Sequence, residues 1–320
     1  MPDAMSEART GPAPTRAGMV FIPGETFRMG AENFYPEERP VHRVRVDGFW
    51  IDRTPVTNAE FRRFVEATGY RTYAEIPPRA EDYPGAPAEM LQPGSLVFTQ
   101  PDGPVPMQMQ HWWRFVLGAD WRHPFGPDSS LDGLDEHPVV HVALCDVEAY
   151  AAWAGKRLPT EAEWELAARC GDKQTDYAWG DELMPGGKPM ANFWQGRFPY
   201  ENLVEDGYER TSPVGAFPPN AFGLVDMIGN TWEWTQDWYR PRHPEDAQKA
   251  CCVPENPRGA AEDASYDAHA PGLRTPRKVL KGGSHLCAPN YCQRYRPAAR
   301  FPHPVDTSTS HVGFRCVADA

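Results

Sequence analysis

The chain has 320 residues, of which 41% are hydrophobic and 24% charged, so it is long enough for one large domain with a packed core. Its formal net charge of −12 argues against a nucleic-acid partner, which would need a basic face. The 35 prolines and 27 glycines interrupt helices and strands often and predict a loop-rich fold.

The beginning of the chain predicts no membrane partner. Residues 1–18 lack the apolar core of a secretory signal, and no apolar run is long enough to span a bilayer. We expect a disordered lead-in over residues 1–18, a single domain over residues 19–320, and a cytoplasmic location. Seven cysteines scattered over the chain do not form a disulfide framework, and three with apolar neighbours are predicted to be buried: Cys145, Cys170 and Cys316.

The first predicted elements are a hairpin, a further strand and a helix. Residues 18–30, GMVFIPGETFRMG, hold two short apolar runs about a Pro-Gly step and predict a hairpin. Residues 42–46 alternate like a strand. Thr57, followed by Glu60, predicts a capped helix that Gly69 ends.

The middle of the chain predicts one strand and two helices. HWWRFV, residues 111–116, predicts a short strand in a region that is otherwise loop. The next helix is predicted to be capped by Asp146 and stopped at Gly155. A second one opens at Thr160 and ends near Gly171.

Beyond residue 172 the periodicity fades and Gly, Pro, Asn and aromatic residues dominate. Residues 241–276 predict a long exposed loop. Residues 277–286 and 311–319 are strand-like, and we expect them to pair near the C-terminus.

Two cysteines, Cys287 and Cys292, stand five positions apart in LKGGSHLCAPNYCQRYRPAAR. Such a pair has four possible fates. It forms a disulfide, which a reducing compartment opposes; it is half of a zinc site, for which no second Cys/His cluster follows; it binds a soft ion such as Cu(I); or it is two unrelated buried thiols. On spacing alone we favour the last.

The neighbours of the pair point toward a built site. Gly282 and Gly283 allow a close backbone approach or positive φ, and Ser284 supplies a hydroxyl. Arginines that point inward would lower the pKa of the thiols, although all three are equally able to form structural salt bridges: Arg294, Arg296 and Arg300. His285 is predicted to be a surface residue.

Two oxygen-rich stretches are candidate calcium sites, because calcium takes six to eight oxygens in irregular geometry. Residues 191–209 offer Asn192 and Asp206, and residues 225–234 offer Asp226 and Glu233. Composition alone favours ordinary turn chemistry at both. The sequence has no Walker loop, dinucleotide fingerprint, G-x-S-x-G elbow or H-E-x-x-H motif.

Several segments in order resemble the sulfatase-modifying factor family, from about Gly18 to Asp319: GKRLPTEAEWE, ANFWQG, FPPNAFGLVDMIGNTWEWTQDW, KGGSHLCAPNYCQRYRPAAR and HVGFRC. Within the family, the G-G-S-x-x-C-x4-C-x-R-Y-R stretch is similar to that of bacterial-type formylglycine-generating enzymes. The resemblance implies an α+β, loop-rich fold related to C-type lectins, with little regular secondary structure. It also implies a copper-dependent oxidase that uses O2 to convert the cysteine of a C-x-P-x-R motif, in an unfolded sulfatase segment, to Cα-formylglycine.

The resemblance also implies roles for individual residues. Cys287 and Cys292 match the copper-binding cysteines, and Ser284 and Trp232 match residues beside the oxygen site. One structural calcium site is implied at Asn192, Phe193, Asp206 and Tyr208, where Phe193 and Tyr208 act through backbone carbonyls. A second is implied at Asp226, Gly229, Thr231 and Glu233.

The departures from the family are informative. Ala151, Ala168 and Pro297 stand where secretory-pathway members carry disulfide cysteines, which agrees with a cytoplasmic bacterial enzyme. His311 stands where Asn is usual, and Asp226 replaces Asn. Two alternatives stay open: a non-catalytic ligand-binding module of the same lectin-like fold, and an iron-dependent sulfur-transfer enzyme, for which the histidine cluster is not evident.

Overall fold

The computed structural model describes residues 16–320 except 82–84, 86, 88–90, 108, 109, 245–252, 271 and 273. The strands are β1 (Met19–Ile22), β2 (Glu25–Met29), β3 (His42–Val46), β4 (Phe49–Asp52), β5 (Gly94–Phe98), β6 (Trp113–Leu117), β7 (Trp232–Trp238), β8 (Arg277–Lys281), β9 (Arg300–Pro304), β10 (Val312–Gly313) and β11 (Val317–Asp319). The α-helices are α1 (Asn58–Thr68), α2 (Leu144–Trp153) and α3 (Glu161–Arg169). The 3-10 helices are η1 (Pro36–Glu38), η2 (Tyr73–Glu75), η5 (Pro185–Gly187) and η7 (Glu262–Ser265).

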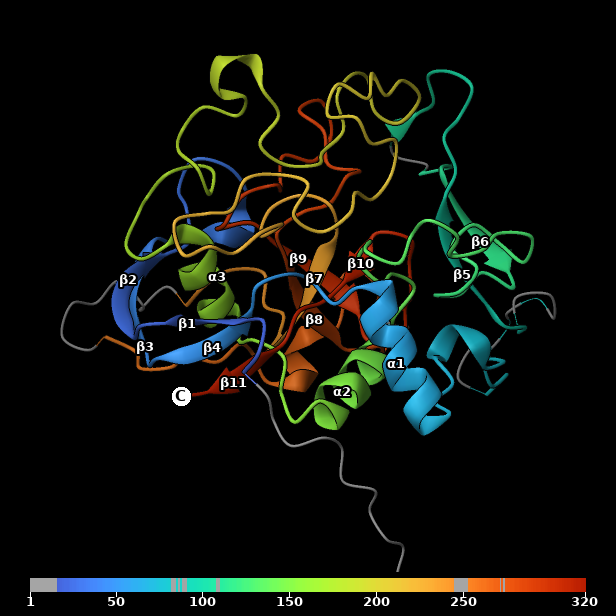
Figure 1. Cartoon of the computed structure of the whole chain (residues 1–320), viewed down its shortest axis with the longest axis horizontal. Helices are drawn as coiled ribbons and strands as arrows, with labels where there is room; N and C mark the ends of the chain where they lie inside the picture. The colour runs from blue at the N-terminus through green and yellow to red at the C-terminus, as the bar shows by residue number, and fades with distance from the viewer. Residues whose placement is uncertain are drawn as a thin grey trace, which may run out of the picture.

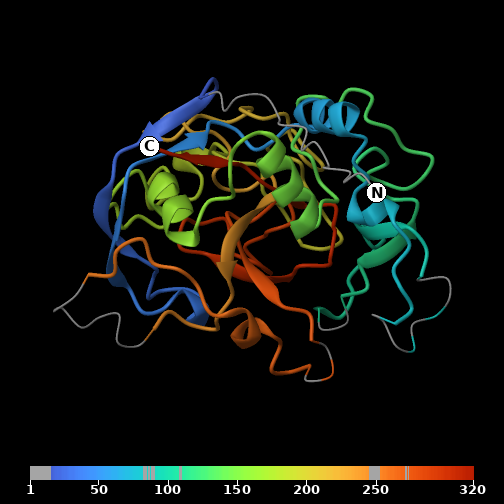
Figure 2. The ribbon, with the colours of Figure 1, turned by 90° about the horizontal axis from the view of Figure 1, so that it is seen from below.

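Short sheets form the framework, and long connections without regular structure surround it (Figure 1). The central sheet has the order β10-β7-β8-β9, a second sheet has the order β1-β4-β11, and β2-β3 and β5-β6 form separate pairs. Helix α3 packs between the central sheet and the β2-β3 pair, while α1 and α2 lie side by side (Figures 1 and 2). This loop-rich α+β architecture agrees with the predicted fold class.

The predictions for α1 and α3 are confirmed. Each helix opens with a capping box, in which the side chain of Thr57 or Thr160 accepts a hydrogen bond from the backbone N–H three residues on. Gly69 ends α1 with φ +68°, whereas Cys170 takes the left-handed position after α3 with φ +56°. Both helices were predictable because the signals lie within a few residues of each end.

Helix α2 begins earlier than predicted. Its N-cap is Ala143, and Asp146 lies within the first turn. The Asp146 carboxylate still caps the helix, because its Oδ2 accepts a hydrogen bond of 2.8 Å from the Ala143 backbone N–H. Asp146 therefore caps the helix as predicted, but from within its first turn and not from the N-cap position.

The predicted hairpin over residues 18–30 is wrong. β1 pairs with β4 and β2 pairs with β3, both antiparallel. A two-residue hairpin link needs positive φ at its first position, and proline cannot supply this at Pro23. The link between β1 and β2 instead passes close to the link between β3 and β4, since a Cβ on Gly24 would lie 2.7 Å from the Gly48 nitrogen.

The predicted pairing of the last two segments is also wrong. β8 is flanked by β7 and β9, so it has no free edge for the C-terminal segment. β10 instead pairs parallel with β7, and β11 pairs antiparallel with β4. The end of the chain is thereby tied both to the central sheet and to its N-terminal strands.

One hydrophobic cluster runs from Ile22 in β1 to Val317 in β11, and a smaller one gathers around Trp112 and Trp194. Cys316 is buried as predicted, but Cys145 is exposed and Cys170 only partly buried. Apolar neighbours in the sequence do not show whether a cysteine side chain points into the core or toward solvent. Among the described residues, no helix has the length and apolarity required to cross a membrane.

The predicted disordered lead-in lies largely outside the described residues and overlaps them only at residues 16–18. The predicted loop over 241–276 contains η7 and is mostly exposed or partly buried where it is described.

Candidate active site

The glycine pair after β8 sets the direction of the cysteine segment. Gly282 and Gly283 have φ values of +93° and +73°. A Cβ on Gly283 would lie 2.8 Å from the Arg294 carbonyl oxygen, and one on Gly282 would lie 2.9 Å from the Met227 carbonyl oxygen. Only glycine satisfies both the left-handed backbone and the close approach.

The two thiols that follow lie together. Cys287 Sγ and Cys292 Sγ are 3.2 Å apart, and both side chains are buried. The turn is held by the backbone N–H of Cys287, which donates to Ser284, and by that of Cys292, which donates to Ala288, each at 2.9 Å. The separation exceeds the ~2.05 Å of a disulfide, so the sulfurs are free thiols in hydrogen-bond contact.

Polar groups distinguish the two sulfurs. The Ser284 backbone N–H lies 3.5 Å from Cys287 Sγ, and Arg294 Nη1 lies 3.8 Å from Cys292 Sγ. Burial raises the pKa of Cys287 well above its ordinary value. The hydrogen bond from Cys287, assisted by the Arg294 guanidinium, lowers the pKa of Cys292. Deprotonation of the pair therefore starts at Cys292.

The arginines after the pair divide by role. Arg294 contacts a thiol and is held by Glu37 at 2.6 Å. Arg296 binds Glu38, and Arg300 binds Glu161 at 2.7 and 2.8 Å, in fully buried ion pairs. Of the three, only Arg294 is therefore placed to act on a thiol, and the others are structural.

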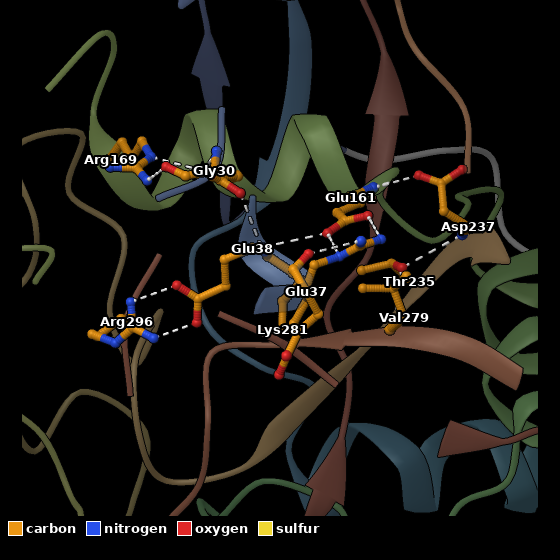
Figure 3. A network of polar contacts seen from close by, with 12 residues as sticks. Gly30, Glu37, Glu38, Glu161, Arg169, Thr235, Asp237, Val279, Lys281 and Arg296 are labelled. Carbon is orange, nitrogen blue, oxygen red and sulfur yellow. Dashed lines mark hydrogen bonds and ion pairs between the residues drawn. The ribbon is translucent and has the colours of Figure 1, made fainter. Parts of the chain in front are cut away.

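These ion pairs belong to a larger buried network around α3 (Figure 3). Lys281, the last residue of β8, contacts Glu165 at 3.0 Å, and Glu165 contacts Arg169 at 2.9 Å. Because Lys281 directly precedes the glycine pair, the network fixes both ends of the cysteine segment.

A pocket of ≈ 400 Å³ opens beside the thiols. Cys287, Cys292, Ser284 and Trp232 all line it, so the structure brings the four predicted catalytic residues together. An aromatic wall completes the pocket: Trp112, Trp113, Phe198, Tyr291 and Phe301. The ring of Tyr291 stacks on that of Phe198 with centroids 4.4 Å apart.

The sequence missed this wall and misplaced one histidine. His285 is buried, and its Nδ1 bonds the Asn230 carbonyl at 2.8 Å, so the predicted surface position is wrong. The Trp-Trp step at 112–113 predicted only a strand. Tyr291, which also belongs to the wall, directly precedes Cys292, and this position was the one local indication in the sequence that it lies at the site.

The residues of the first predicted calcium site lie together and leave an acceptor unused. Asn192 is buried and its Oδ1 has no hydrogen-bond partner. The Gln195 Nε2 amide lies between the Phe193 carbonyl and Asp206 Oδ2. The Tyr208 backbone N–H binds the other oxygen of Asp206 at 3.0 Å. Oxygen ligands of this kind suit calcium.

The second predicted calcium site contains a protein cation instead. Both oxygens of Glu233 bind Arg315, and Trp164 Nε1 donates to Glu233 Oε2 at 2.7 Å. Arg315 also binds the Asp226 carbonyl oxygen. The Asp226 carboxylate accepts from the Gly215 N–H at 2.6 Å, and burial raises the pKa of Asp226 to about 6. With the carboxylate of Glu233 neutralised, calcium binding at Asp226, Gly229, Thr231 and Glu233 stays a prediction.

Among the described residues, no three His, Cys, Asp or Glu side chains gather in a metal-binding arrangement. A four-ligand zinc site at the cysteine pair is therefore not formed by these residue types. The pair is a two-sulfur site with an open side toward the pocket.

Comparisons with known proteins show the family to which the chain belongs. The family model of the sulfatase-modifying factor enzyme 1-like domain matches residues 4–320. A formylglycine-generating enzyme of Mycobacterium tuberculosis is 55% identical over 94% of this chain and 97% of its own length. One from Streptomyces coelicolor is 45% identical over 100% of this chain and 96% of its own length. The solved structure of PvdO from Pseudomonas aeruginosa shares the fold, with TM-score 0.59, 24% identity and 94% of each chain covered.

Proposed function

Because this chain belongs to the sulfatase-modifying factor family, we propose that it is a formylglycine-generating oxidase, which converts a sulfatase cysteine to formylglycine. The observation that carries the proposal is the pair of free, buried sulfurs 3.2 Å apart at the wall of an aromatic pocket. A non-catalytic binding module of the same fold has no need for such a pair.

We further propose that Cys287 and Cys292 hold Cu(I). The donor set fits, because thiolates are soft ligands that select this ion, and because both sulfurs face each other at the pocket. When bound, Cu(I) would supply electron transfer to O2, which closed-shell zinc does not offer. Arg294 beside Cys292 offsets the negative charge that the sulfurs concentrate in a buried place.

The remaining residues of the pocket act on water, substrate and thiols. Trp232 walls the pocket and restricts water next to the sulfurs. The Ser284 hydroxyl accepts a hydrogen bond of 3.3 Å from the Leu286 N–H, which leaves its proton available to a partner at the site. Two backbone hydrogen bonds close the turn from Ser284 to Cys292 and keep the two sulfurs at a fixed separation.

The aromatic wall suits an extended substrate segment. Tyr291 and Phe301 are 36% and 37% exposed although their rings pack on Phe198 and Trp232. Exposed aromatic side chains that are held rigid by buried ones are typical anchors for a bound peptide. We propose that the C-x-P-x-R segment of an unfolded sulfatase lies along this wall, with its cysteine at the thiol pair.

The test of the function is direct. The chain loaded with Cu(I) is incubated in air with a Cys-x-Pro-x-Arg peptide, and the product is analysed by mass spectrometry. We expect the aldehyde, and none from the matched Ser-x-Pro-x-Arg peptide or under nitrogen. Loaded protein that yields no aldehyde in air contradicts the proposed function.

We propose calcium at the first oxygen site, supported by the unused Asn192 Oδ1. Calcium at 100 times its dissociation constant would stabilise the fold by about 2.7 kcal/mol. We expect calcium to raise the melting temperature of the wild type and of Asp132→Ala, which alters an exposed aspartate, but not that of Asp206→Ala. An equal calcium response in all three proteins contradicts the site. The cytoplasmic location stays a prediction.

A further inference from the structure

Three histidines lie close enough to His311 to act on its charge: His141, His285 and His303. All three are fixed by backbone carbonyls, at Pro124 (2.9 Å), Asn230 (2.8 Å) and Thr307 (3.0 Å) respectively. A ring N–H that donates to a carbonyl satisfies a buried group and sets the tautomer. These three are accounted for as structural histidines.

His311 differs from the other three. Its Nδ1 contacts the Thr309 hydroxyl at 2.7 Å, and its ring packs on Trp113 with centroids 4.7 Å apart. Its carbonyl accepts the Trp232 N–H at 2.9 Å, so it sits beside a predicted site residue. The imidazole also lines the thiol pocket. Within the described part of the chain, Nε2 has no hydrogen-bond partner.

The Thr309 contact decides which ring nitrogen carries the hydrogen. The hydroxyl of Thr309 has no other hydrogen-bond partner in the described ranges. If Nδ1 carried the hydrogen, the buried Thr309 hydroxyl would accept it and leave its own proton without an acceptor. We therefore assign the hydroxyl as the donor and Nδ1 as the lone-pair nitrogen. The hydrogen of the neutral ring is then on Nε2, which has no hydrogen-bond partner among the described residues.

The surroundings keep this ring neutral. Burial and the imidazoles of His285, His303 and His141 hold the pKa of His311 well below its usual range. No Asp or Glu is among the described residues that line the pocket, and the Cys292 thiolate on its wall is paired with Arg294. Because Arg294 offsets that negative charge, burial decides the protonation of the ring and disfavours a second proton.

We propose that His311, oriented by Thr309, is a hydrogen-bond donor of the reaction: its Nε2–H binds a lone pair on an oxygen or sulfur atom at the reacting end of the substrate. The inference rests on the proposed function, since it needs the substrate cysteine in this pocket. In this proposal the His311 imidazole acts in the chemical step, and Thr309 is a positioning residue.

The tautomer is tested without any turnover. The full chain is labelled with 15N-histidine, and long-range 1H–15N spectra report which nitrogen of each ring is protonated. The His311 signals are those that vanish in His311→Gln. We expect Nε2–H at neutral pH; a hydrogen on Nδ1, or a doubly protonated ring, overturns the proposal.

The role in the reaction is tested with three variants. His311→Gln keeps an N–H near the position of Nε2, and we expect its kcat to stay within about threefold of the wild type. His311→Leu removes the donor, and we expect kcat to fall by at least about tenfold. His269→Gln, at an exposed histidine, is the matched control and should not change kcat.

The outcomes separate the claims. If His311→Leu raises KM and leaves kcat unchanged, the donor holds the peptide rather than its reacting end, and the proposal is wrong. Equal losses in the Gln and Leu variants also overturn it, because the donor would then be irrelevant. If the wild type itself forms no aldehyde, the proposed function fails, while the tautomer measurement still stands on its own.

Discussion

At the scale of single residues, the site depends on the difference between two chemically identical side chains. Cys292 has Arg294 at 3.8 Å and receives the hydrogen bond of Cys287. Among the described residues, the further donor to Cys287 is the backbone N–H of Ser284. One thiolate and one thiol is therefore the arrangement with the least uncompensated charge. A soft monovalent cation would displace the shared proton.

The glycine pair before these cysteines includes a sensitive position, Gly283. Gly283→Ala combines a left-handed backbone at φ +73° with a Cβ 2.8 Å from the Arg294 carbonyl and the Tyr295 nitrogen. We expect it to lower the free energy of unfolding by more than about 2 kcal/mol, in chemical denaturation. Gly133→Ala is the matched control, because it has φ +77° with open space around the added carbon.

The control isolates the close approach from the backbone strain. Gly133→Ala should show the strain alone, about 1–2 kcal/mol. Equal losses at the two glycines would mean that the contact with the chain at 294–295 is unimportant.

At the scale of elements, η1 and α3 hold the cysteine segment from both sides. Glu37 of η1 binds Arg294, and Glu161 at the start of α3 binds Arg300. Glu38 of η1 binds Arg296 (Figure 3). These partners are more than a hundred residues apart in the chain. The irregular segment after Cys292 is thus fixed by ion pairs where regular secondary structure is lacking.

Breaking one of these pairs should be costly because the partner stays buried. Glu38→Gln leaves the guanidinium of Arg296, which is 1% exposed, without its counter-charge. We expect a loss of about 3–5 kcal/mol in the free energy of unfolding. Asp135→Asn, in the exposed pair with Arg62, should cost less than about 1 kcal/mol. Similar losses in both variants would contradict the role of the buried network.

The elements differ in how far the sequence predicts them. α1 and α3 follow from capping boxes that lie within four residues. β9 contains Pro302 and Pro304, and prolines in a segment argue against a strand in any local prediction. The sheet tolerates these prolines because β9 is an edge strand. The partners of β1 and β8 are set by packing between distant segments, which alternation along one segment does not encode.

At the scale of the whole molecule, the pocket is assembled from segments that meet only in the folded chain. The cysteine pair was recognisable from one short stretch, because Cys287 and Cys292 are only five positions apart and a single turn brings them together. Trp112, Phe198 and Tyr291 come from three separate regions, and their meeting depends on the tertiary fold. The buried ion pairs around α3 were not predictable for the same reason.

Buried imidazoles should make the molecule sensitive to acid. Burial lowers the pKa of His141, His285 and His303 to about 4 each. Their stabilising effect is complete above the unfolded value of ~6.5 and is lost as the pH falls toward 4, since the unfolded chain binds the protons first. Burial raises the pKa of Asp146 and Asp226 to about 6, which opposes this trend below that pH.

The histidines act at the higher pH, because their unfolded value of ~6.5 lies above the pKa of about 6 of the two aspartates. We expect the free energy of unfolding to fall between about pH 7 and pH 6, at a slope of roughly 1.4 kcal/mol per pH unit for each additional proton that the unfolded chain binds. Urea denaturation at several pH values measures this. An unchanged or higher midpoint at the lower pH would show that the imidazoles are not buried as described.

The measurement that tests the account most directly is Cu(I) binding by competition with a chromophoric chelator, in the wild type and three single variants. We predict one Cu(I) per wild-type chain, its loss in both Cys287→Ser and Cys292→Ser, and its retention in Cys145→Ser, which alters an exposed thiol. Parallel turnover should follow the same order. Full binding of Cu(I) by either of the first two variants would contradict a site made by both sulfurs.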